Sequence, residues 1–307
     1  MSTIKNYLSL VKFSHTIFAM PFAFIGYFLA TYDRALYLRL NLKDNIHINP
    51  PRFHSEFSLY KLLLVLVCMI TARSAAMAFN RWLDKNFDAK NPRTAIREIP
   101  AGIVSANSAL MFVVINCVAF IVSTAFINRI CLILSPVALF VILFYSYTKR
   151  FTALCHLVLG LGLALAPIGA YLAVTGKFAV LPVLFSFTVL FWVSGFDIIY
   201  ALQDVEFDQS QKLHSIPARL GIKNALRVSE LLHVFSALLV IAAGLIAPFG
   251  WVYWVGVAVF VGMLLYQHSI VKPNDLRRVN IAFMTANGVA SVVFAVFVIA
   301  DLFLYNL

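Results

Sequence analysis

Long apolar runs alternate with short polar segments from one end of the chain to the other. About 20 apolar residues suffice to cross a bilayer as an α-helix, whereas the strands of a membrane barrel would be about ten residues long and alternating. The pattern predicts nine transmembrane helices, at residues 8–31, 58–79, 103–127, 130–147, 152–174, 180–202, 225–247, 251–271 and 280–303. We therefore predict an all-α polytopic membrane protein in which residues 1–307 form a single integral membrane domain.

One polar segment is longer than the others. Residues 32–57, between the first and second predicted spans, contain Pro50, Pro51 and two histidines. Because proline and polar residues interrupt regular helices, this insert is predicted to be a loop or a short surface helix.

Composition and charge support a membrane protein. The chain is 62% hydrophobic and 12% charged, against roughly 45–50% and 25% in soluble domains. The net charge of +11 would indicate a nucleic acid partner in a soluble protein, but here the basic residues lie between spans and set topology, so we expect no nucleic acid. Sixteen of them fall on the side of the N-terminus and six on the other. This bias predicts a cytoplasmic N-terminus, and we expect the bacterial inner membrane.

Acidic residues gather in two short windows. Seven of the 13 acidic residues lie within 77–102 and 197–208, which continue the second and sixth predicted spans. The topology prediction places both windows on the cytoplasmic side. Because acidic residues contribute little to topology, this coincidence indicates one site at which two Asp-rich motifs face each other across a central cavity.

Each window carries oxygen ligands at helical spacing. A pair of aspartates is separated by four residues, and a further polar residue lies one or two turns before the pair. Mg²⁺ takes one or two protein carboxylates and fills its other positions with water and phosphate, so two such pairs could hold roughly two or three Mg²⁺ ions around a diphosphate. The predicted metal ligands are Asn80, Asp84, Asp88, Asp204 and Asp208. The four aspartates of this set and Asp197 are predicted to be catalytic.

Basic residues accompany these acids. Arg93 and Arg97 could bind phosphate oxygens or neutralise a departing diphosphate. Lys149 and Arg150 could do the same, could bind the carboxylate of an acceptor, or could only set topology. A single charged run is often a solvated ion-pair surface, but two clusters on one side of the membrane favour a site.

The two windows resemble the signatures of a known family. The sequence NRWLDKNFD at 80–88, followed by RTAIREIPAG at 93–102, resembles the first signature of the UbiA superfamily of intramembrane prenyltransferases. DIIYALQDVEFD at 197–208, followed by HSIPARLG at 214–221, resembles the second. YSYTKRFT at 145–152 resembles a segment of the hydroxybenzoate polyprenyltransferase branch, and nine spans also fit the family.

This resemblance implies a reaction. An allylic polyprenyl diphosphate would bind with its head on Mg²⁺ held by both motifs and its tail in an apolar tunnel that opens to lipid. Loss of diphosphate would leave an allylic cation, which a phenolic ring attacks at a carbon ortho to its hydroxyl. The implied acceptor is an aromatic acid of quinone biosynthesis, 4-hydroxybenzoate for ubiquinone or 1,4-dihydroxy-6-naphthoate for menaquinone.

Two departures from the family pattern concern the acceptor and the phosphates. Many members carry aspartate where this chain has Arg81, which removes a carboxylate and adds a candidate phosphate contact. HSIPARLG stands where many hydroxybenzoate enzymes read KSTA, and it looks closer to relatives in the futalosine route to menaquinone.

Four further residues are candidates for substrate contact. Arg73 lies inside the second span, where a charge is functional by default, although a structural ion pair is the alternative. Tyr145 and Tyr200 could support a cation through their ring faces, or could be interfacial tyrosines. His214 could touch phosphate. Small residues of the fifth span are instead expected to allow close helix packing: Gly160, Gly162, Ala166 and Gly169.

Two classes of alternative stay open. The same fold could serve another acceptor, such as haem, a chlorophyll precursor or a glycerol phosphate lipid. An ion-coupled transporter would also use intramembrane carboxylates, but it would place them near the middle of the bilayer in broken helices. No alternative implies an obligate protein partner.

Overall fold

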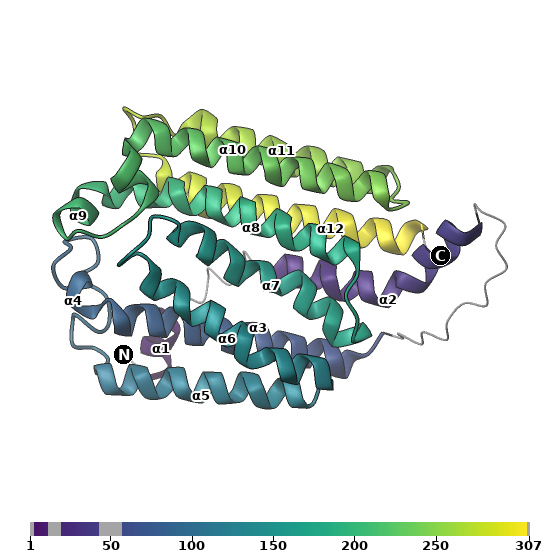
Figure 1. Ribbon diagram of the computed structural model, residues 1–307, viewed down its shortest axis with the longest axis horizontal. Coiled ribbons are helices and arrows are strands. Elements are labelled where there is room, and N and C mark those ends of the chain that lie inside the picture. The colour runs from purple at the N-terminus through teal and green to yellow at the C-terminus, as the bar shows by residue number, and fades with distance from the viewer. Residues whose placement is uncertain (1–2, 12–19, 43–56, 306–307) are drawn as a thin grey trace.

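The described chain is almost entirely helical. The computed structural model describes residues 3–11, 20–42 and 57–305. Its long helices run side by side along the longest axis of the molecule (Figure 1). Within these residues, eight segments are long and apolar enough to cross a membrane. They contain α3 (Leu59–Leu83), α5 (Ala106–Ala125), α6 (Arg129–Thr148), α7 (Cys155–Thr175), α8 (Val180–Ala201), α10 (Ile216–Ile246), α11 (Trp251–Ile270) and α12 (Asn287–Tyr305).

These eight segments correspond to the second through ninth predicted spans, with shifted ends. The largest shift is in α10, which begins at Ile216 rather than at residue 225. Gly221 interrupts it with a φ of 77°, a backbone conformation that glycine adopts without steric cost. Apolar periodicity alone did not identify this polar first part of α10 as helical.

The first predicted span, 8–31, is not one continuous helix. Thr3–Leu10 form α1 and Met20–Leu42 form α2, while residues 12–19 lie outside the described part. Pro21, which the prediction placed inside the span, lies in α2. The apolar part of α2, Met20–Thr31, is shorter than the eight spans, so the count of nine stays a prediction.

The polar insert predicted at 32–57 begins as helix. α2 continues without interruption to Leu42, so residues 32–42 are helical. The rest of the insert, residues 43–56, lies outside the described part of the chain.

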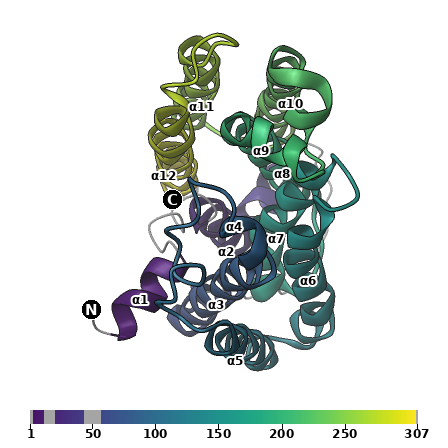
Figure 2. The ribbon, with the colours of Figure 1, turned by 90° about the vertical axis from the view of Figure 1, so that its left-hand side faces the viewer.

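α2 lies in the middle of the bundle (Figure 2). It contacts α3, α7, α8 and α12. The ring of Phe22 packs against those of Trp192 and Phe294, with centroid distances of 5.4 and 5.9 Å. These fully buried rings form the centre of the largest hydrophobic cluster, which fixes α8 and α12 around α2.

The two acidic windows lie at the same end of the bundle. α3 is followed by the short helix α4 (Lys85–Asp88), and α8 by a 3₁₀ turn (Leu202–Asp204) and α9 (Val205–Ser210). Figure 1 shows α4 and α9 next to each other beyond the ends of the long helices. Asn91 of the first window donates to Asp204 of the second at 3.2 Å, so the two windows are in direct contact.

Candidate functional site

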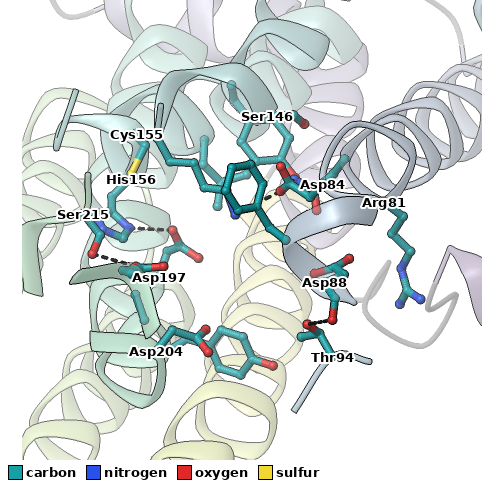
Figure 3. Close-up of a pocket in the computed structure, with 18 of the residues that line it drawn as sticks. Arg81, Asp84, Asp88, Thr94, Ser146, Cys155, His156, Asp197, Asp204 and Ser215 are labelled. Carbon is teal, nitrogen blue, oxygen red and sulfur yellow. Dashed lines mark hydrogen bonds and ion pairs between the residues drawn. The ribbon is translucent and has the colours of Figure 1, made fainter. Parts of the chain in front are cut away.

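A polar cavity of about 280 Å³ opens where the two windows meet (Figure 3). Its walls come from α3, α4, α6, α7, α8 and α9 and from the chain that follows α4. The structure brings together twelve of the predicted site residues around it. They are Arg73, Asn80, Asp84, Asp88, Arg93, Arg97, Tyr145, Lys149, Asp197, Tyr200, Asp204 and Asp208.

Two predicted site residues do not line this cavity. The side chain of His214 is exposed, and its backbone N–H donates to the Lys149 carbonyl at 2.7 Å. Arg150 lies behind the wall, with its guanidinium 5.4 Å from the ring of Phe87 and 5.2 Å from that of Tyr147. Substrate contact by His214 and by Arg150 stays a prediction.

The helical spacing of the first window persists past the end of α3. Asp84 caps this helix, and its N–H donates to the Asn80 carbonyl at 2.9 Å. The N–H of Asp88 in turn donates to the Asp84 carbonyl at 2.8 Å. Because these i to i−4 bonds continue, the three side chains stay on one face and line the same cavity.

Asp84 is the most buried of the cavity aspartates, at 2% exposure. Lys149 Nζ and Arg150 Nη2 each lie 2.9 Å from it, on different oxygens. Asn80 Nδ2 donates to it at 3.3 Å. A buried carboxylate needs such partners, because its desolvation is otherwise costly. Lys149 and Arg150 are thus held by Asp84, whatever else they contact.

Two arginines from the chain after α4 bind two further aspartates of the cavity, Asp88 and Asp204. Arg97 Nη1 donates to both oxygens of Asp88, at 2.8 and 2.9 Å. Arg93 Nε donates to Asp204 at 3.0 Å, and its Nη1 donates to the Tyr200 hydroxyl at 3.0 Å. Burial lowers the pKa of Arg93, but its hydrogen bonds and proximity to Asp204 outweigh this effect, so the net pKa is raised. Arg93 therefore stays charged in the site.

Two cavity aspartates have no arginine or lysine partner among the described residues. Ser215 Oγ donates to Asp208 at 2.9 Å. His156 Nδ1 lies 2.7 Å from Asp197 Oδ2, and both side chains line the cavity. Sequence analysis did not identify His156 or Ser215. An ionisable residue within an apolar run was the available signal for His156.

The donor set fits magnesium bound together with a diphosphate. Among the described residues, no three His, Cys, Asp or Glu side chains converge closely enough to hold a metal by themselves. The cavity does carry several carboxylates and the amide of Asn80, which are oxygen ligands. Mg²⁺ prefers oxygen and commonly takes only one or two carboxylates per ion, with phosphate and water completing its shell. These residues can therefore contribute part of each coordination shell.

A second, apolar cavity of about 400 Å³ adjoins the first. It lies among α3, α5, α6 and α7, and it shares five lining residues with the polar cavity. The buried Nε of one of them, Arg73, has no hydrogen-bond partner among the described residues. The shared residues, which mark the junction, are Arg73, Met77, Tyr145, Leu159 and Leu163.

Small residues on α7 serve this cavity as well as helix packing. A Cβ on Gly160 would lie 2.4 Å from the Leu190 carbonyl oxygen, so Gly160 does allow α8 to approach closely. Gly169 has open space in its place, and Gly162, Ala166 and Gly169 all line the apolar cavity. The expectation of close packing therefore holds for Gly160 and is wrong for Gly169.

Comparison with known proteins identifies relatives over most of the chain. The UbiA prenyltransferase family matches residues 52–298. A 4-hydroxybenzoate octaprenyltransferase of Nitrosospira multiformis is 31% identical, over 76% of this chain and 80% of its own length. An enzyme of the same name from Nitrosomonas europaea is 28% identical, over 79% of this chain and 82% of its own length.

Solved structures share the fold. The apo structure of a UbiA homolog from Aeropyrum pernix K1 has a TM-score of 0.76 at 28% identity, covering 95% of this chain and 98% of its own. A UbiA homolog from Archaeoglobus fulgidus bound to DMAPP and Mg²⁺ has a TM-score of 0.69 at 18% identity, covering 97% and 99%. At that lower identity the likeness shows the fold alone.

Proposed function

Because this chain belongs to the UbiA prenyltransferase family, we propose that it transfers a polyprenyl group to an aromatic hydroxy acid in quinone biosynthesis. The donor is an allylic polyprenyl diphosphate. The acceptor is of the 4-hydroxybenzoate or 1,4-dihydroxy-6-naphthoate type. The chain is an integral membrane protein, and we place its site and N-terminus on the cytoplasmic side of the bacterial inner membrane.

The observation that carries this proposal is the continuity of the two cavities. One is lined by carboxylates and arginines and suits a metal diphosphate, while the other is apolar and suits an isoprenoid tail. They meet at Arg73 and Tyr145. The allylic carbon of a donor that occupied both cavities would lie near this junction.

The basic side chains have a double role in this proposal. Arg93, Arg97 and Lys149 now neutralise aspartates, and all three line the polar cavity. Bound Mg²⁺ would supply charge stabilisation of the departing diphosphate. The three cations would then bind phosphate oxygens, since charge-assisted hydrogen bonds to phosphate are strong.

Arg73 is our candidate for binding the acceptor carboxylate. Lys149 and Arg150 already contact Asp84, whereas Arg73 Nε is buried without a hydrogen-bond partner in the described chain. A buried N–H without a partner is costly, and a substrate carboxylate would satisfy it. The position of Arg73 at the junction would direct the aromatic ring toward the allylic carbon.

Aromatic rings protect the reactive centre from water. Tyr200 packs on Phe283 with a centroid distance of 4.2 Å, and both line the polar cavity. Phe283 lies in a π-helical turn, Ile281–Ala286, that precedes α12. Ring faces favour a nearby cation, and apolar walls exclude the water that would capture an allylic cation.

One assay tests the proposal. Membranes containing the protein receive Mg²⁺, a labelled polyprenyl diphosphate, and either 4-hydroxybenzoate or 1,4-dihydroxy-6-naphthoate. We expect one acid to be alkylated at a carbon ortho to a hydroxyl. If the folded protein alkylates neither acid, the aromatic acceptor is wrong, and haem, chlorophyll-precursor and glycerol phosphate acceptors are tested next.

A further inference from the structure

Asp197 differs from the other cavity aspartates in its partner. Asp84, Asp88 and Asp204 are each paired with lysine or arginine. Asp197 is paired instead with His156, whose Nδ1 lies 2.7 Å from its Oδ2. A carboxylate bound by arginine is a weak proton acceptor, because the cation stabilises its charged form. Asp197 contacts neither lysine nor arginine in the described chain.

Asp197 has apolar neighbours along its own helix. It belongs to the regular part of α8, and Val193 and Phe196 of the same helix line the cavity beside it. Its side chain is 23% exposed, while that of His156 is 4% exposed. The histidine therefore lies behind the carboxylate and the carboxylate faces the cavity, as Figure 3 shows.

The hydrogen bonds of His156 define its proton position. The backbone N–H of Ile216 donates to His156 Nε2 at 3.4 Å. In the neutral imidazole, acceptance at Nε2 places the proton on Nδ1, and the imidazolium also carries a proton there, so Nδ1–H donates to Asp197 in either form. No described residue bonds the other carboxylate oxygen, Asp197 Oδ1. Oδ2 is thus held by His156, and Oδ1 is available to accept a proton.

The two helices that carry this pair are tightly packed next to it. A Cβ on Gly160 would lie 2.4 Å from the Leu190 carbonyl oxygen. Ser194 Oγ donates to the His156 carbonyl at 3.1 Å. α7 and α8 therefore have little freedom to move apart here, which preorganises the carboxylate.

Resting on the proposed prenyl transfer, we propose that Asp197 accepts the proton released by the acceptor ring and that His156 is its positioning residue. The allylic C–O bond breaks, and its electron pair leaves with the diphosphate. A ring carbon then forms the new C–C bond to the allylic carbon. The C–H bond at that ring carbon breaks, its electrons restore aromaticity, and the proton passes to Asp197.

The test uses acceptors deuterated at the ring carbons ortho to the hydroxyl. Full-length protein in membranes receives whichever of 4-hydroxybenzoate and 1,4-dihydroxy-6-naphthoate is alkylated in the unlabelled assay. We expect no isotope effect in the wild-type protein, since a well-placed base removes the proton quickly. In His156→Ala we expect kcat to fall roughly 10- to 100-fold, the lower part of the range for general-base catalysis, with an unchanged KM for prenyl diphosphate and a new primary isotope effect.

Two further variants keep the test decisive if His156→Ala does not fold. Asp197→Asn is isosteric, and we expect it to lose turnover or to show a larger isotope effect. His156→Asn places an amide N–H where Nδ1–H was, and we expect it to restore the wild-type rate and remove the isotope effect. Turnover by Asp197→Asn at the wild-type rate, or slow turnover by a folded His156→Ala without an isotope effect, would overturn the proposal.

His233 provides a matched control. It is as buried as His156, at 3% exposure, but it bonds His268 at 2.9 Å and lines neither cavity. His233→Asn should show no isotope effect whatever its stability, and an effect there would also count against the proposal. If the wild-type protein alkylates neither unlabelled acid, the proposed function has failed before any variant is made.

Discussion

Arg81, which lines the polar cavity, forms an ion pair with Glu98, with side-chain exposures of 4% and 11%. The Arg81 side chain extends away from Asp84 (Figure 3). Glu98 also accepts a hydrogen bond from Ser9 of α1. Where sequence comparison made Arg81 a candidate phosphate contact, the structure pairs it with Glu98. The pair joins α1, the end of α3 and the chain that carries Arg93 and Arg97.

Removing one member of this pair should destabilise the protein. Arg81→Met leaves the carboxylate of Glu98 buried without its counter-charge, which typically costs about 3–5 kcal/mol. Adding Glu98→Leu should recover most of this loss, because no buried charge then remains. Thermal unfolding in detergent measures both. Arg277, whose pair with Asp275 has its guanidinium 87% exposed, is the control, and Arg277→Met should leave the unfolding temperature unchanged. If the destabilising effects of Arg81→Met and Glu98→Leu simply added, the energetic coupling of the two residues would be contradicted.

Alanine substitution of Asp84 and of Asp208 should have the same effect on activity but different effects on the stability of the protein. We expect Asp84→Ala and Asp208→Ala to abolish prenyl transfer, because each removes a proposed ligand for the metal diphosphate. Only Asp84→Ala should also lower the unfolding temperature, since it leaves Lys149 and Arg150 without their shared partner. Transfer assays and thermal unfolding separate the two effects.

Glu206 is the control for this pair of variants. It lies two residues from Asp208 on α9, but it is exposed and does not line the cavity. Glu206→Ala should keep wild-type turnover. If both aspartate variants kept their activity, the hypothesis that the two acidic windows form one catalytic site would be wrong.

Arg73 should affect the acceptor rather than the donor. Arg73→Met should raise the KM of the aromatic acid by roughly 10- to 100-fold, since a charge-assisted hydrogen bond contributes about 1.5–3 kcal/mol. The KM of the prenyl diphosphate should change little. With an acceptor that lacks the carboxylate, wild type and variant should become equivalent. A larger change in the diphosphate KM would instead make Arg73 a phosphate residue.

A larger side chain at Gly169 should be compatible with folding but should reduce the turnover of prenyl diphosphates with long chains. No atom of the described chain lies within 4 Å of a Cβ at this position, which faces the apolar cavity. Gly169→Leu should fold, and it should reduce turnover of a long polyprenyl diphosphate more than that of dimethylallyl diphosphate. In contrast, Gly160→Ala should destabilise the fold, since its Cβ would meet the Leu190 carbonyl. Equal losses for long and short donors would contradict an isoprenoid site in this cavity.

Asp301 is a buried carboxylate far from the site, and we expect a structural role. It accepts the N–H of Gly250 at 2.9 Å and that of Tyr253 at 3.0 Å, and so caps α11 from α12. Asp301→Ala should cost about 1–2 kcal/mol through loss of this cap. Activity per folded molecule should not change. A variant that folds normally but does not turn over would assign Asp301 to function instead.

The sequence alone determined the class of protein and most of its helices. Eight apolar runs correspond to eight long helices, because a span must satisfy all its backbone hydrogen bonds internally and therefore has a length that composition reveals. It also determined the two acidic windows and the family, because both rest on residue types at fixed spacing within short segments. In the first window the i to i+4 spacing persists past the end of α3. The apolar pattern at 8–31 did not reveal that α1 ends at Leu10, because hydrophobicity continues past that residue.

Only the tertiary structure decided which charges pair. Arg81, Arg93 and Arg97 lie within one stretch of sequence, yet they bind Glu98, Asp204 and Asp88 respectively. The choice depends on how α3 and α8 place their ends together, which no local pattern encodes. The contact of His156 with Asp197 was likewise inaccessible from sequence, since 41 residues separate them. The packing of α7 on α8 creates this contact, which joins the two residues to which we assign the proton transfer.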